Sequence, residues 1–79
     1  MMLLATFFTH YGAMKFHKQC KDVGIVSKMM PVPRSLSSSC GVCVQFEAQS
    51  PPEGDLYDLE NYYIVKNDGG YEKWTTQAN

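Results

Sequence analysis

The sequence predicts an α+β domain of the ferredoxin-like type, a split βαβ arrangement with two helices on one face of a four-stranded antiparallel sheet. The main observation is the order of periodic segments, which is strand, helix, strand, strand, helix, strand. The chain of 79 residues is also short enough for one domain, so residues 1–79 are assigned to it as a whole. In addition, Pro31 and Pro33 mark the end of the second strand.

The first strand and the first helix are predicted within residues 2–24. Met2 to Phe8 is an apolar run that ends in β-prone residues, and Thr9 can cap the helix that follows. Apolar side chains recur at helical spacing at Ala13, Phe16 or His17, Cys20 and Val23. Gly24 suits the position just after the last helical turn.

The second and third strands are predicted on either side of a proline- and serine-rich loop. Ile25 to Met30 is a short strand, and because prolines donate no ladder hydrogen bond we expect it at a sheet edge. Gly41 to Glu47 alternates between two faces, as a half-buried strand does. Val42, Val44 and Phe46 lie on one face, with Cys43, Gln45 and Glu47 on the other.

The second helix is predicted to start at the segment SPPE, residues 50–53. Serine suits the N-cap, proline the first turn, and Glu53 follows three residues after the serine. This helix would carry Leu56, Leu59 and Tyr63 inward, end before Asn67–Gly70, and precede a last strand from Tyr71 to Thr76. A competing interpretation makes Tyr62 to Lys66 a strand that pairs with Tyr71 to Thr75 across the same turn. The choice between helix and strand at residues 62–66 stays open.

The predicted topology gives the loops a common setting. The third strand lies between the first and second and runs opposite to both. The end of strand one, the start of helix one, the end of strand two and the start of strand three therefore share one rim. We expect Thr9, His10, Arg34 and Cys40 to converge there.

Composition and charge exclude several classes of function. Hydrophobic residues make up 44% and charged residues 19% of the chain, which is typical of a globular domain. A domain of this size buries only about 60% of its unfolded surface, so a homo-oligomer is a candidate state. The net charge is −1 and no long basic run is present, which argues against nucleic-acid binding.

The location expected from the sequence is the cytoplasm. The apolar start, residues 1–8, is too short to span a bilayer and lacks the charged region and cleavage site of a signal peptide. No membrane segment is therefore expected. The chain has three cysteines, an odd number that argues against a disulfide framework, and cytoplasmic thiols stay reduced.

The stretch SSSCGVC, residues 37–43, raises alternatives that the residues alone leave open. Cys40 and Cys43 as a redox pair would stand about 10 Å apart along a strand, beyond the roughly 7 Å that a disulfide allows. Zinc binding by His17, Cys20, Cys40 and Cys43 would need ligands about 15 Å apart along the first helix to meet, so no metal is assigned.

The third alternative is that Cys40 is a single reactive thiol. A thiolate is favoured beside a helix N-terminus, a cation or backbone amides, and the rim offers the helix start, Arg34 and the loop at 37–41. His10 can add a base or a cation, and Gly41 leaves the sulfur uncovered. The fourth alternative is that Cys40 is only a loop residue.

The remaining side chains have structural interpretations. Cys43 points away from the apolar face of its strand and is interpreted as a structural residue at a surface or interface. The aromatic residues are interpreted as core and interface: Tyr11, Tyr57, Tyr62, Tyr63, Tyr71 and Trp74. Asp55, Asp58 and Glu60 would form the solvated face of the second helix.

The segment MPVPRSLSSSCG, residues 30–41, carries a family resemblance. Together with the strand end FFT (residues 7–9) and a helix leading into Gly24 and Ile25, it resembles the selenium/sulfur carrier protein-like family of small domains. The resemblance runs from the first strand to the second helix. Its most specific part is the PxPR and SSCG run, and Cys43 departs from the small apolar residue expected at that position.

The resemblance implies a function for Cys40. It implies that this cysteine carries sulfur or selenium as a persulfide or selenosulfide, and that Pro33, Arg34, Ser38, Ser39 and Gly41 shape its loop. The partners would be sulfur or selenium donor and acceptor proteins, and the chain would act as a carrier rather than as a catalyst, with no cofactor. A structural or regulatory module that self-assembles without thiol chemistry is the alternative.

Overall fold

The first half of the chain folds close to its predicted elements. The computed structural model describes residues 1–54 and 56–75. The elements within this part are β1 (Met2–Phe7), α1 (His10–Asp22), β2 (Ser27–Pro31), β3 (Val42–Glu47), β4 (Leu59–Val65) and β5 (Tyr71–Lys73). Thr9 caps α1 as predicted, because its hydroxyl accepts a hydrogen bond from the amide of Gly12. Gly24 follows the helix at a φ of 79°.

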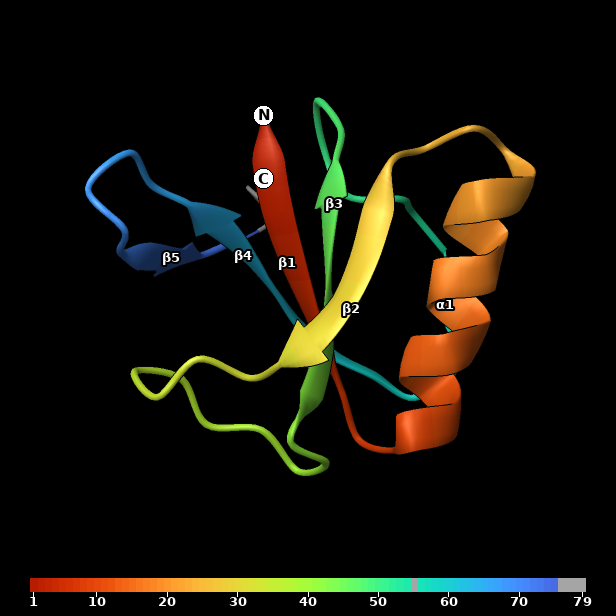
Figure 1. Cartoon of the computed structure of the whole chain (residues 1–79), viewed down its shortest axis with the longest axis horizontal. Coiled ribbons are helices and arrows are strands. Elements are labelled where there is room, and N and C mark those ends of the chain that lie inside the picture. The colour runs from red at the N-terminus through yellow and green to blue at the C-terminus, as the bar shows by residue number, and fades with distance from the viewer. Residues whose placement is uncertain (55, 76–79) are drawn as a thin grey trace.

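All neighbouring strands of the single sheet run antiparallel, in the order β2-β3-β1-β4-β5 (Figure 1). The prediction that the third strand lies between the first two and opposes both is confirmed. β2 lies at one edge of the sheet, where its terminal Pro31 leaves no ladder position unfilled on a neighbour.

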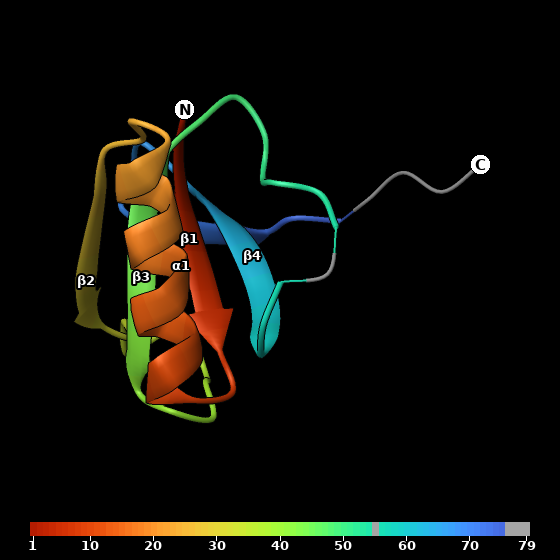
Figure 2. The same ribbon diagram turned by 90° about the vertical axis from the view of Figure 1, so that its right-hand side faces the viewer.

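The ferredoxin-like prediction is wrong, because the described residues form one helix and five strands in one sheet. Residues 48–58 cross as a loop, on the side of the sheet that α1 covers (Figure 2). The competing interpretation of the C-terminal half is the one the structure adopts, since β4 pairs with β5 from Tyr63 opposite Lys73 to Val65 opposite Tyr71. The predicted Thr76 end of the last strand lies outside the described residues.

The physical reason for the missing helix lies in its residues. Pro51 and Pro52 donate no backbone hydrogen bond, and Gly54 adopts a φ of 101°, which is not helical. The run Tyr62 to Val65 consists of aromatic and β-branched residues, which favour strands. As β4, this run also fills the edge of β1 that would otherwise lack a hydrogen-bonded partner.

One face of the sheet and α1 enclose the core. Its fully or nearly buried side chains are Leu3, Ala5, Phe7, Ala13, Phe16, Cys20, Val44 and Phe46. The ring of Phe16 lies at the centre, 5.4 Å from that of Phe7 and 5.1 Å from that of Phe46. Leu56 of the loop and Trp74 after β5 pack against the same cluster. In the part of the chain that the structure describes, no helix has the length and apolar character to cross a membrane.

Candidate functional site

Cys40 lies in the loop that joins β2 to β3, and its side chain is half-buried. Its thiol donates a hydrogen bond to the carbonyl oxygen of Val42, with the sulfur 3.2 Å from that oxygen. The loop is closed by a backbone hydrogen bond of 3.0 Å from the amide of Val32 to the carbonyl of Gly41. Gly41 has a φ of 77°, a left-handed conformation that favours glycine at this reversal. The local geometry thus holds the sulfur beside the start of β3.

Ser38 and Ser39 anchor this loop to the carboxylate of Glu60. The hydroxyl of Ser38 lies 3.1 Å from one carboxylate oxygen, and that of Ser39 lies 3.2 Å from the other. The amide of Ser39 donates to the same carboxylate at 3.4 Å, and Ser38 also donates to the carbonyl of Phe7 at 3.3 Å. The serine loop therefore meets the end of β1, at the rim where the sequence placed it.

Sequence analysis missed Glu60, which it assigned to the solvated face of a second helix. In the structure, Thr6 pairs with Asn61 and Phe7 with Leu59, so Glu60 is the extra residue of a bulge in β4. Asp58 was missed in the same way, and its carboxylate accepts a hydrogen bond of 2.6 Å from Thr9. Asp55, the third residue of that predicted face, lies outside the described residues. The strand interpretation of residues 62–66 was the available signal.

Arg34 and His10 lie at the same end of the sheet with exposed side chains. Arg34 is in the turn after β2, and His10 is the first residue of α1, next to the capping Thr9. Within residues 1–54 and 56–75, neither side chain forms a hydrogen bond or an ion pair. The donors nearest to Cys40 in the sequence, Ser38 and Ser39, are engaged by Glu60. The immediate polar neighbour of the sulfur is therefore an acceptor, the Val42 carbonyl.

Cys43 is fully buried, which corrects its prediction as a surface or interface residue. It stands between Thr6 and Met30 in the sheet, and its thiol is 3.7 Å from the carbonyl oxygen of Pro31. Burial raises the pKa of the Cys43 thiol to about 11, and a negative charge on Cys40 would raise this pKa as well. Cys43 is thus held as a neutral thiol close to Cys40.

The other cysteine alternatives can be compared with the positions of the sulfurs. The structure describes all three cysteines, and each is a free thiol. Cys20 is buried in the core, and His17 places its Nδ1 atom 2.8 Å from the hydroxyl of Ser27. Among the described residues, no group of three or more His, Cys, Asp and Glu side chains is arranged to hold a metal ion.

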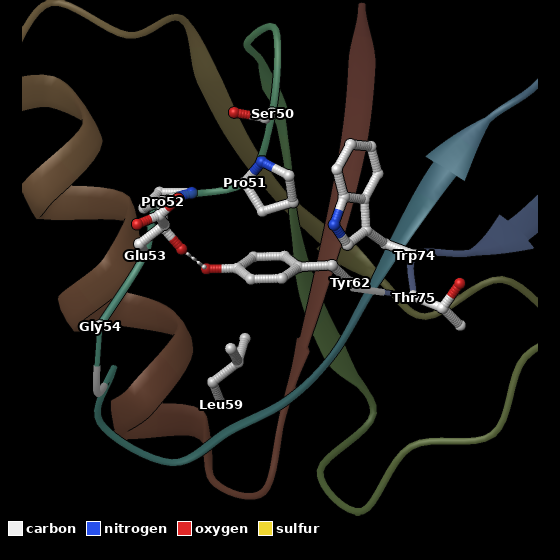
Figure 3. Close-up of a pocket in the computed structure, with 9 residues that line it drawn as sticks. All are labelled: Ser50, Pro51, Pro52, Glu53, Gly54, Leu59, Tyr62, Trp74 and Thr75. Atoms are coloured by element: carbon white, nitrogen blue, oxygen red, sulfur yellow. Dashed lines mark hydrogen bonds between the residues drawn. The ribbon is translucent and has the colours of Figure 1, made fainter. Parts of the chain in front are cut away.

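The largest hollow of the molecule, about 570 Å³, lies away from these thiols (Figure 3). Its lining residues are Ser50, Pro51, Pro52, Glu53, Gly54, Leu59, Tyr62, Trp74 and Thr75. The hydroxyl of Tyr62 donates to the carbonyl of Pro52 at 3.5 Å, and burial raises the pKa of this phenol. Tyr62 and Trp74 are half-buried and pack against the core, in agreement with their predicted structural role.

Comparison with known proteins identifies a family and no individual relative. Residues 2–53, which are 52 of the 79 residues, match the family described as "Putative Se/S carrier protein-like". The matched segment contains β1, α1, β2, β3 and the whole Cys40 loop. No curated protein matches the chain, and no solved structure does. The match covers well over half of the sequence, and the chain therefore belongs to the Se/S carrier protein-like family.

Proposed function

We propose that the chain carries sulfur or selenium as a persulfide or selenosulfide on Cys40. The observation that supports this proposal is the exposure of the three thiols. Cys20 and Cys43 are buried, whereas Cys40 is partly exposed in a loop of the segment that matches the carrier family. A carrier thiol must meet the sulfur of one protein and then that of another, and Cys40 is the thiol whose position suits two such encounters.

The proposed loading step is an exchange between thiols. The Cys40 sulfur, as thiolate, attacks the terminal sulfur of a donor persulfide, R–S–SH. A new S–S bond forms on Cys40, the S–S bond of the donor breaks, and the donor leaves as a thiolate that takes up the proton lost by Cys40. Transfer to an acceptor repeats this step in reverse, and a donor R–S–SeH would deliver selenium in the same way. No net oxidation occurs, and cytoplasmic conditions, where thiols stay reduced, suit this chemistry.

The side chains around the loop have proposed roles in this exchange. Arg34 and His10 supply positive charge near the bound persulfide anion, to which they can swing because both are exposed. Ser38 and Ser39 hold the loop through Glu60, and Gly41 gives the turn that leaves the sulfur accessible. Cys43 enters this proposal as a buried neighbour that keeps its proton, so it does not compete for the cargo.

The test is the intact mass of the protein after incubation with a cysteine desulfurase and cysteine. We expect the native chain to gain one sulfur atom, and to gain one selenium atom when selenocysteine and its lyase are supplied. Cys40→Ser should abolish both gains, whereas the control Cys43→Ala should retain them. A gain that survives Cys40→Ser, or no gain in the native chain, would contradict the proposal.

A second candidate function is an interaction module without thiol chemistry. It is favoured by a cluster of exposed aromatic side chains at the helix start, where Phe8, Tyr11 and Tyr57 are each more than half exposed. The rings of Tyr11 and Tyr57 contact each other at 5.5 Å. Self-assembly that disappears in Tyr57→Ser but persists in Cys40→Ser, measured by light scattering, would support this function over the carrier.

A further inference from the structure

A second group of reactive side chains lies where α1 ends and β2 begins, apart from the Cys40 loop. His17 and Cys20 are three residues apart on α1, so their side chains project from the same face of the helix. The chain reverses at Gly24, and the amide of Ile25 donates to the carbonyl of Cys20 at 2.8 Å. This reversal brings Ser27, the first residue of β2, against both side chains.

The three side chains form a hydrogen-bonded series. The Nδ1 atom of His17 lies 2.8 Å from the hydroxyl oxygen of Ser27, and the same hydroxyl hydrogen bonds with the Cys20 thiol. A hydroxyl can accept a proton on one side while it donates its own on the other. Burial raises the pKa of the Cys20 thiol, and the hydrogen bond from Ser27 opposes that effect. Ser27 therefore connects a buried thiol to a half-buried imidazole.

A cleft of about 220 Å³ opens beside Cys20. Its walls are apolar, formed by Phe16 of the core, Val23 and Ile25 after the helix, and Pro52 and Leu56 of the 48–58 loop. This volume equals that of roughly seven water molecules at about 30 Å³ each, which is enough for a small organic molecule. Val23 is 71% exposed, so the cleft is reached from solvent along that side.

We propose that Cys20 is a nucleophilic thiol that adds to small apolar α,β-unsaturated carbonyl compounds entering this cleft, with Ser27 and His17 as its proton relay. The sulfur forms a bond to the β-carbon, and the π-electrons of the C=C bond move to the carbonyl to give an enolate. The thiol proton passes to Ser27, and the Ser27 proton passes to Nδ1 of His17. The imidazolium then returns a proton to the α-carbon through Ser27, so the addition is balanced without any other reactant.

This site differs from the other buried thiol in ways that make Cys43 an internal control. Both cysteines are at most 2% exposed. Cys43 has a backbone carbonyl as its polar neighbour and lines none of the three hollows found among the described residues. Reaction at Cys43 therefore reports on unfolding of the molecule, whereas reaction at Cys20 reports on the cleft as well.

The experiment measures labelling by N-ethylmaleimide, an apolar α,β-unsaturated carbonyl probe, in the Cys40→Ser background. Peptide mapping by mass spectrometry follows Cys20 and Cys43 separately. We expect Cys20 to react at least tenfold faster than Cys43, and to prefer N-ethylmaleimide over a sulfonated maleimide. Equal rates at the two cysteines would overturn the proposal, because unfolding would then be the common route to both.

The relay is tested with a pair of variants that have the same shape. Ser27→Thr keeps the hydroxyl, whereas Ser27→Val replaces it by a methyl group, and both residues suit a strand. Labelling of Cys20 should stay within about threefold of the parent in the threonine variant and fall about tenfold in the valine variant. If the valine variant fails to fold, His17→Gln serves in its place with the same expected loss. Equal labelling in Ser27→Thr and Ser27→Val, or no loss in His17→Gln, would refute the relay.

Discussion

At the scale of single residues, the three cysteines are distinguished by what surrounds each sulfur. Cys40 is partly exposed beside a carbonyl, Cys43 is sealed beside another carbonyl, and Cys20 lies against a hydroxyl and a cleft. Because the thiolate is the reactive form, burial without a donor makes a cysteine inert. The sequence shows three identical side chains, and only the packing assigns them different chemistry.

The burial of Cys43 predicts a loss of stability at high pH. Its pKa is raised from the ordinary value of 9.0 to about 11, so the folded state keeps the proton where the unfolded state has lost it. The stabilisation is fully present below about pH 9 and is lost as the pH rises toward 11. Between about pH 8 and pH 10.5, the free energy of unfolding should fall by about 2 kcal/mol through this residue.

The measurement compares urea unfolding of the native chain and of Cys43→Ala at these two pH values. The alanine variant should be less stable at about pH 8, because it leaves a small cavity, but its stability should fall about 2 kcal/mol less on going to pH 10.5. The tyrosines and lysines that also titrate in this range are common to both proteins. Parallel pH profiles would show that Cys43 ionises as readily as a free cysteine.

At the scale of elements, the start of α1 depends on a close approach between the helix and the turn before β4. A Cβ atom added to Gly12 would lie 2.9 Å from the Cβ of Asp58 and 3.0 Å from the carbonyl oxygen of Tyr57. The hydrogen bond from Thr9 to Asp58 holds the same two segments together. Glycine at position 12 thus allows the helix to contact backbone directly.

We expect Gly12→Ala to destabilise the protein by about 1–3 kcal/mol, through overpacking against this turn. Alanine in a helix interior otherwise stabilises by about 1 kcal/mol relative to glycine, so the sign of the change is informative. The measurement is the free energy of unfolding in urea. Met14→Ala is the control, since Met14 is an exposed residue of the same helix and should change little. A stabilised Gly12→Ala would mean that the turn moves aside freely.

The same scale explains which elements could be predicted. Residues 2–47 have clear signals, namely a capping threonine, a helical repeat ending in glycine, and a strict alternation in β3, and these elements formed with small shifts in their ends. For residues 50–65, Leu56, Leu59 and Tyr63 fit a helical repeat as well as a strand. Local sequence could not decide between the two, because the deciding contact is the pairing of β4 with β1, more than 50 residues away.

At the scale of the whole molecule, the candidate site was predictable only in outline. The rim where the Cys40 loop meets the end of β1 follows from strand order, which was predicted correctly for β1, β2 and β3. Glu60 could not be found, because its contact with Ser38 and Ser39 needs both the fourth strand and its bulge. The burial of Cys43 was missed for a related reason, since alternation along β3 gives the face of a side chain and not what covers that face.

The small size of the molecule also makes its last strand important for stability. At roughly 0.05–0.15 kcal/mol per residue, a 79-residue domain has about 4–12 kcal/mol of total stability. Trp74 follows β5, donates its backbone amide to the carbonyl of Tyr62 at 2.8 Å, and packs its half-buried ring against the core. This position lies beyond residues 2–53, the segment that matches the carrier family.

Trp74→Ala should therefore cost about 2 kcal/mol and lower the melting temperature by roughly 8–16 °C. The backbone hydrogen bond to Tyr62 is kept in this variant, so the loss measures the contact of the ring with the core. Glu72→Ala, an exposed position in β5, should leave the melting temperature nearly unchanged. Equal melting temperatures for the two variants, measured by circular dichroism, would mean that the family segment is stable without the β4–β5 hairpin. A large loss at Trp74 alone would instead show that β5 completes the core on which the Cys40 loop is held.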